Sequence, residues 1–157
     1  MSDDQPNMPG RIGLGLLLRR THRGFAAAMA GRLAELGLTH AEFHHLRRLN
    51  ERDGVSSSEL SDLVEVKKAS STAILDALER KGLIRRERDA ADRRRVNVFL
   101  TGDGRAIQPA LKACAETVNE VSALYMTPAE RAQLFDLLER VNKGLAEAPR
   151  HGSDAAE

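Results

Sequence analysis

Apolar residues recur at helical spacing along most of this chain. Between residues 11 and 36 the recurring positions are Leu14, Leu17, Leu18, Phe25, Met29 and Leu33. This spacing predicts a long amphipathic helix, which Gly37 ends. The same criterion predicts further helices over about 39–50, 56–64, 68–81, 104–124 and 127–145.

Three of the predicted helices begin with a capping box. The pairs are Thr39 with Glu42, Ser56 with Glu59 and Thr127 with Glu130. In such a pair the hydroxyl accepts from a backbone amide three residues on, while the carboxylate accepts from the amide of the cap residue. These pairs therefore fix where the helices start.

Alternation replaces helical spacing over residues 83–88 and 95–100, which predicts two strands. The polar segment 89–94 between them predicts a hairpin loop. We therefore expect a mainly α fold with a small β-hairpin. The length of 157 residues favours one domain over 11–146. Residues 1–10 and 147–157 lack periodic hydrophobicity and are expected to be a flexible N-terminus and tail.

Composition excludes several classes of protein. The single cysteine, Cys114, cannot form an internal disulfide, which favours a reducing cytoplasm. The longest apolar run, residues 12–18, is far shorter than the roughly 20 residues of a membrane span. Aromatic residues make up only 3%, which argues against RNA or single-stranded partners.

Total charge is misleading for this chain. Lysine and arginine number 24 and acids 23, and a net charge of +1 alone argues against a nucleic-acid partner. Residues 80–95, however, contain eight cations and three acids, a local net charge of +5. The eight cations are Arg80, Lys81, Arg85, Arg86, Arg88, Arg93, Arg94 and Arg95. An ordinary solvated face and a DNA contact both fit this cluster, and the surrounding motifs favour DNA.

Two short helices followed at once by a basic hairpin predict a winged helix-turn-helix, whose second helix enters the major groove of DNA. The amino end of that helix suits the role. Lys67 and Lys68 supply cations for phosphates, and Ser70, Ser71 and Thr72 supply hydroxyls for phosphates or base edges.

The ordered motifs resemble the multiple-antibiotic-resistance regulator (MarR) family of bacterial transcription factors. They lie at residues 38–43, 58–60, 68–86 and 92–104, and the resemblance covers about residues 11–146. It implies a two-fold dimer in which helices within 11–36 and 104–146 interlock and present DNA-binding lobes, residues 39–101, to a pseudo-palindromic operator. It also implies that Asp92 orients the hairpin and that Arg94 enters the minor groove.

The predicted DNA-binding residues combine both sources of inference. They are Lys67, Lys68, Ser70, Ser71, Thr72, Arg85, Arg86, Asp92, Arg93, Arg94 and Arg95. The acid-free first helix carries Arg19 and Arg23 one turn apart, which fits a solvated face, a DNA backbone contact or an anionic effector. Because the resemblance implies a pocket between dimer helices and lobe, we name Arg19, Arg23, His44 and His45 as candidate effector residues. An aromatic acid or an acyl-coenzyme A would suit them.

Other chemistry has little support in the sequence. His40 and His44 are four residues apart, but no second paired motif supplies further metal ligands. Cys114 fits a buried small residue better than a redox sensor. No catalytic or cofactor motif occurs.

We therefore predict a cytoplasmic, homodimeric, ligand-responsive repressor of double-stranded DNA, without enzymatic activity, cofactor or membrane association. The alternatives are a winged-helix protein-interaction adaptor and a metal- or redox-gated regulator of the same fold.

Overall fold

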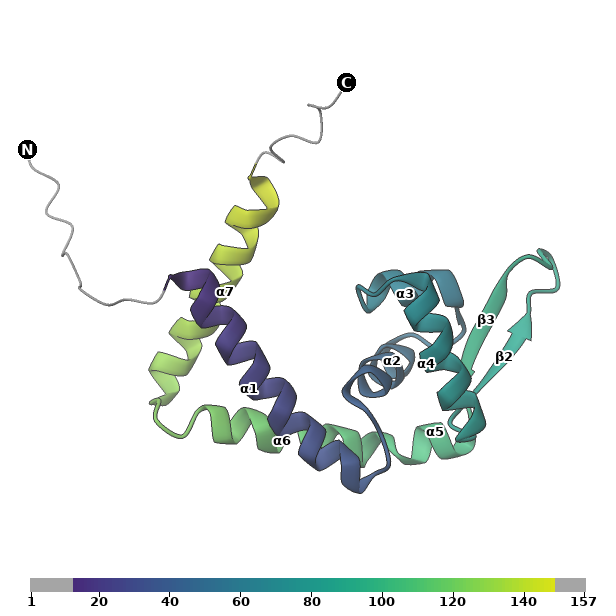
Figure 1. The fold of residues 1–157 in the computed structure, drawn as a ribbon, viewed down its shortest axis with the longest axis horizontal. Helices are drawn as coiled ribbons and strands as arrows, with labels where there is room; N and C mark the ends of the chain where they lie inside the picture. Colours follow the sequence, from purple (N-terminus) through teal and green to yellow (C-terminus); the bar gives the residue numbers. More distant parts are fainter. Residues whose placement is uncertain (1–12, 149–157) are drawn as a thin grey trace, which may run out of the picture. The chain divides into compact units, whose positions relative to one another are not determined.

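The computed structural model describes residues 13–148. The predicted N-terminal segment 1–10 and residues 149–157 of the predicted tail lie outside this range. The elements are α1 (Leu14–Glu35), α2 (His40–Glu51), β1 (Val55–Ser56), α3 (Ser57–Leu63), α4 (Lys68–Arg80), β2 (Ile84–Arg88), β3 (Val96–Leu100), α5 (Gly102–Ala106), α6 (Gln108–Ser122) and α7 (Pro128–Glu147) (Figure 1). The predicted mainly α fold with a β-hairpin is confirmed.

All three predicted capping boxes are present, at the starts of α2, α3 and α7. In the first, the amide of Thr39 donates to Oε2 of Glu42 at 2.8 Å, and the amide of Glu42 donates to Oγ1 of Thr39 at 3.2 Å. Helix starts were therefore predictable to within one residue at these three places.

The sheet has three antiparallel strands in the order β1-β3-β2. The sequence analysis missed β1, because a strand of two residues cannot show an alternating pattern. Val55 pairs with Val98 of β3, and the side chain of Asp53 accepts from the amide of Leu100 at 2.9 Å. The hairpin is therefore joined to the loop that follows α2.

The predicted helix over 104–124 is wrong as a single helix, because the structure has α5 and α6 in its place. Thr101 caps α5 by accepting from the amide of Gly104 at 3.0 Å. Pro109 has no amide hydrogen to donate to the carbonyl of Arg105, which explains the break near Ile107.

The chain divides into two compact units, one ending at Val118 and the other beginning at Asn119. The core of the first unit is aliphatic. Its fully buried apolar side chains include Leu33, Leu46, Leu49, Leu60, Leu75, Leu78 and Val98. They come from α1, α2, α3, α4 and β3, so α1 shares one core with the lobe of residues 39–101.

The second unit contains the end of α6 and all of α7. No residue of α7 is buried, although the helix carries several large apolar side chains. Those that are exposed are Leu134, Phe135, Leu137 and Leu145. Among the described residues, no helix is long and apolar enough to cross a membrane.

Candidate nucleic-acid interface

The amino end of α4 presents polar side chains to solvent. Lys67, Lys68, Ser70 and Thr72 are all exposed there, as the sequence analysis expected. The hydroxyl of Thr72 donates to the carbonyl of Lys68 at 3.0 Å, which leaves its lone pairs free to accept. The positive end of the helix dipole lies at the same place and favours an anion such as a phosphate.

Ser71 corrects the sequence analysis, because it does not face solvent. Its side chain is only 2% exposed, and its Oγ lies 3.0 Å from Nε2 of His45 on α2. Helical geometry is the reason: when Ser70 and Thr72 point outward on either side, the residue between them points toward the core. Ser71 is therefore an interior residue and not a groove contact.

The loop of the hairpin is organised by Asp89, which the sequence analysis did not name. Its carboxylate accepts from the amides of Ala91 at 2.8 Å and Asp92 at 3.0 Å, and from the side chain of Asn97 at 3.0 Å. The bond from the Asp92 amide is the main reason that the pKa of Asp89 lies below its ordinary value. An aspartate that opens a polar loop was the available sequence signal.

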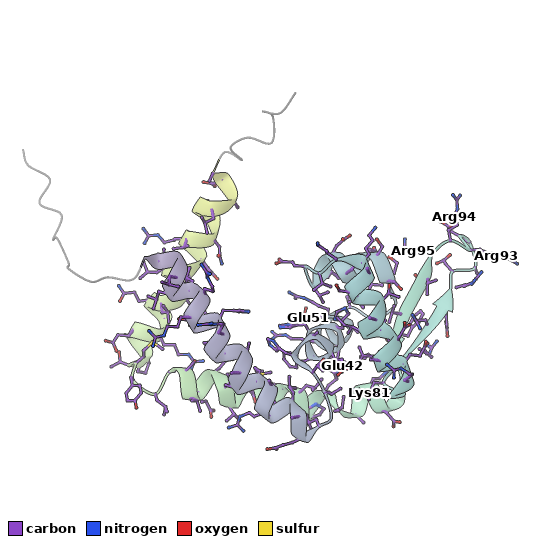
Figure 2. All side chains as sticks on the ribbon, in the orientation of Figure 1. Glu42, Glu51, Lys81, Arg93, Arg94 and Arg95 are labelled. Atoms are coloured by element: carbon purple, nitrogen blue, oxygen red, sulfur yellow. The ribbon has the colours of Figure 1, made fainter. Side chains whose placement is uncertain are left out.

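Asp92 and Arg94 occupy the tip of the hairpin. The amide of Arg94 donates to Oδ1 of Asp92 at 3.0 Å, and the side chain of Arg94 is 97% exposed. Arg93, Arg94 and Arg95 lie at the end of the hairpin that is farthest from α5 (Figure 2). Nε of Arg94 lies 3.8 Å from Oδ1 of Asp92, a long contact between two exposed groups. The tip therefore carries a guanidinium that is almost fully exposed to solvent and has one weak acidic partner.

Other cations of residues 80–95 are engaged within the lobe. Nη2 of Arg86 lies 2.6 Å from Glu79 and 2.7 Å from Asp76, and the bond to Glu79 is the main reason that the pKa of Arg86 is raised. Nζ of Lys81 lies 2.7 Å from the buried Glu42 (Figure 2). Arg86 was predicted to contact DNA, but in the structure its ion pairs connect β2 to α4.

Arg85 and Arg95, which were also predicted to contact DNA, each have one acidic partner within the protein. Arg95 lies 2.6 Å from Glu59, and Arg85 pairs with Glu87 while its guanidinium lies 4.7 Å from the ring centre of Phe99. Both arginines remain about half exposed. The local charge of +5 therefore overstates what is free to meet phosphates.

A groove of about 530 Å³ lies between α3, α4 and the hairpin. It is lined by Ser56, Ser57, Ser58, Thr72, Arg86, Asp92, Arg94, Arg95 and Val96. The structure thus brings together the start of α4 and the hairpin tip, which are about twenty residues apart in sequence. It also adds Ser57 and Ser58, for which the serine run at residues 56–58 was the only signal.

The candidate effector residues differ in their exposure. Arg19 and Arg23 are exposed on α1. His44 is exposed on α2, and its Nε2 lies 3.2 Å from Nε2 of His40. Partial desolvation of its ring among neighbouring side chains, followed by nearby positive groups, lowers the pKa of His44. His45 is a correction: it is buried, and both its ring nitrogens have partners inside the lobe, so it does not line an effector pocket.

The structure also bears on metal and thiol sensing. Within residues 13–148 no group of three or more ligating side chains is placed to hold a metal. Cys114 is half-buried against the core, as expected for a small apolar residue.

Comparison with known proteins agrees with this geometry. A sequence model of the MarR family matches residues 38–96. The chain is 29% identical over 128 residues to the HTH-type transcriptional repressor NicR of Pseudomonas putida. The aligned segment covers 82% of this chain and 81% of NicR. The chain is 33% identical over 114 residues to the HTH-type transcriptional regulator TtmR of Methylorubrum extorquens. This alignment covers 73% of this chain but only 57% of the length of TtmR.

A solved structure carries information on ligand response. It is that of Bordetella bronchiseptica BpsR, whose DNA binding is regulated by 6-hydroxynicotinic acid. This structure matches with a TM-score of 0.75 and 29% identity, over 82% of this chain and 98% of BpsR.

Proposed function

Because the chain belongs to the MarR family of transcriptional regulators, we propose that it is a dimeric repressor which binds a pseudo-palindromic operator and is released by a small anionic effector. It acts in the cytoplasm and catalyses no reaction. The NicR repressor supports the direction of control, and BpsR supports response to an aromatic acid.

One observation carries the DNA-binding part of this proposal. Thr72 of α4 and Arg94 of the hairpin tip line the same groove, and the side chain of Arg94 is almost fully exposed. With α4 in the major groove, a hairpin at this position reaches the backbone and the adjacent minor groove. A minor groove attracts an extended arginine because its negative potential is high where it is narrow.

The second half of the operator requires a second copy of the chain. Two recognition helices must lie about one turn of DNA apart, roughly 34 Å, to enter successive major grooves. An effector that favours a different spacing lowers operator affinity. A coupling free energy of about 1–3 kcal/mol is enough to change affinity about 5- to 150-fold.

The effector would be an anion with an aromatic or acyl-coenzyme A body. Arg19 and Arg23 offer guanidinium groups on α1, and His44 offers an imidazole on α2. Planar guanidinium groups bind carboxylates and phosphates through paired hydrogen bonds.

The experiment is a DNA-binding titration with duplexes selected by the wild-type protein from a random library. Substituting Arg94→Ala should weaken binding and reduce the slope of log Kd against log salt by about one per hairpin. Arg140→Ala is the control, because this exposed arginine of α7 is separated from residues 39–101 by about forty residues of sequence and pairs with Asp136 of its own helix. An unchanged affinity and salt slope for Arg94→Ala would refute the role of the hairpin.

A further inference from the structure

A hydrogen bond inside the lobe links α2 to the amino end of α4. The side chains of His45 and Ser71 are 1% and 2% exposed, and His45 Nε2 lies 3.0 Å from Ser71 Oγ. The other ring nitrogen, Nδ1, lies 2.8 Å from the carbonyl oxygen of Ala41. Because a carbonyl can only accept, Nδ1 carries the proton, and Nε2 of the neutral ring accepts from the Ser71 hydroxyl.

This bond constrains the rotation of α4 about its own axis. Successive residues of an α-helix point about 100° apart, so the inward direction of Ser71 fixes the outward directions of Ser70 and Thr72. The aliphatic core beneath α4, at Leu75 and Leu78, holds the helix against the lobe. Apolar contact is not directional, whereas a hydrogen bond loses strength when its angle changes.

A second polar contact leaves the same stretch of α2 and reaches the other end of α4. Glu42, three residues before His45, accepts from Nζ of Lys81 at 2.7 Å, and Lys81 is the residue that follows α4. The two contacts together hold α4 near both ends. Only the His45 contact lies beside the residues that face the groove.

We propose that His45 is a positioning residue for DNA recognition, which sets the rotation of α4 through Ser71 and thereby decides which base edges Ser70 and Thr72 reach. The proposal rests on the proposed function, in which α4 lies in the major groove. His45 itself does not touch DNA, because it is buried.

The test compares specific with non-specific binding. Ser71→Ala removes the donor, His45→Leu removes the acceptor, and His45→Gln restores an acceptor oxygen. For each variant, Kd is measured on the selected duplex and on a scrambled duplex of equal length, together with the urea midpoint of unfolding. We expect Ser71→Ala and His45→Leu to lower the ratio of specific to non-specific affinity by about tenfold, because one well-placed base contact discriminates by about 5- to 150-fold.

Three further results are expected if the bond acts as proposed. Non-specific affinity and its salt slope stay at wild-type values, because no phosphate contact is lost. His45→Gln recovers most of the ratio. The double variant Ser71→Ala with His45→Leu is no worse than either single variant, since both remove the same bond.

Ser61→Ala is the matched control. Ser61 is also a buried serine, 1% exposed, but its hydroxyl donates at 2.7 Å to Ser58 within α3. This variant should lower stability and leave the affinity ratio unchanged.

The proposal is overturned if Ser71→Ala keeps the wild-type ratio, if His45→Gln is as impaired as His45→Leu, or if Ser61→Ala lowers the ratio equally. Failure of the proposed function would look different. The wild-type protein itself would then show no preference among duplexes, and both proposals would be refuted.

Discussion

Arginines of the hairpin differ in what their charges contact. Arg94 is 97% exposed, whereas the guanidinium of Arg86 is shared between Glu79 and Asp76. A cation whose charge is already neutralised within the protein displaces few counterions from DNA. Stability and DNA affinity should therefore depend on different arginines.

Arg86→Ala is predicted to lower the free energy of unfolding by about 1 kcal/mol, because it leaves two carboxylates without their shared partner. It should change the salt slope of DNA binding far less than Arg94→Ala does. Urea denaturation and binding titrations at several salt concentrations measure the two effects. An equal loss of salt slope in the two variants would show that Arg86 leaves its carboxylates to contact DNA.

Glu42 makes the stability of the lobe sensitive to acid. Burial alone raises the pKa of its carboxyl, but hydrogen bonds from Lys81 and from the amide of Thr39 outweigh burial, and the pKa lies below the ordinary value of 4.5. A carboxyl whose pKa is lower in the folded chain stabilises the fold fully above its unfolded pKa. That stabilisation disappears as pH falls through the folded pKa.

Glu42→Gln keeps a capping acceptor but removes the charge. At about pH 7 this variant should be less stable than wild type by about 1–2 kcal/mol, because Lys81 loses a charged partner. The difference should begin to shrink as pH falls below the ordinary carboxyl pKa and disappear below the lowered pKa of the folded chain, where the wild-type group is also neutral. Urea denaturation at neutral and acidic pH measures it, and a difference that does not vary with pH would contradict the interpretation.

At the scale of elements, the approach of α5 to the chain before β2 depends on one glycine. A Cβ added at Gly104 would overlap the carbonyl oxygen of Leu83 and would also lie 3.2 Å from Cδ2 of Leu100. The same carbonyl accepts from the amide of Thr101 at 3.1 Å, so it cannot move freely. The sequence Leu-Thr-x-x-Gly at residues 100–104 therefore serves packing as well as capping.

Gly104→Ala is predicted to destabilise the lobe by about 1–3 kcal/mol, or more if the backbone cannot relax. Gly102→Ala, two residues earlier on α5, has open space around the added carbon and should change stability by less than about 0.5 kcal/mol. Thermal unfolding of the two variants compares them directly. Equal unfolding temperatures would refute the packing argument.

At the scale of the whole molecule, exposed apolar side chains suit the proposed contact with a second copy of the chain. On α7, Leu134, Phe135, Leu137 and Leu145 are 39–69% exposed in a single chain. Leu14, Leu16 and Leu17 of α1 are also about half exposed. Side chains of this kind at the two ends of the chain fit the dimerisation helices that the sequence analysis predicted.

Phe135→Asp is predicted to shift the dimer toward monomer, because it places a charge in the apolar interface. Operator affinity should fall by at least tenfold, since one monomer contacts only one half-site. Sedimentation velocity measures the assembly, and circular dichroism checks that the helices persist. A variant that remains dimeric with wild-type affinity would exclude α7 from the interface.

Local signals in the sequence determined most of the elements. Capping boxes, helical spacing and alternation depend on neighbouring residues, so the starts of α2, α3 and α7 and both hairpin strands were predictable. The resemblance to the MarR family pointed to Arg94, and the run of lysines and hydroxyl residues at 67–72 pointed to the amino end of α4. The local signals could not reveal β1, which is too short for a pattern, and they did not use Pro109, which divides the predicted fifth helix.

Only the tertiary structure decided which polar residues face solvent and which cations are free. Ser71 and Thr72 are adjacent residues that both carry a hydroxyl. Ser71 is buried against His45, whereas Thr72 lines the groove. Arg86 and Arg94 look alike in the basic cluster, yet Glu79 and Asp76 neutralise only the first. The reason is physical: the direction of a side chain on its helix, and the partners that reach it from other elements, depend on packing between distant segments and not on local composition.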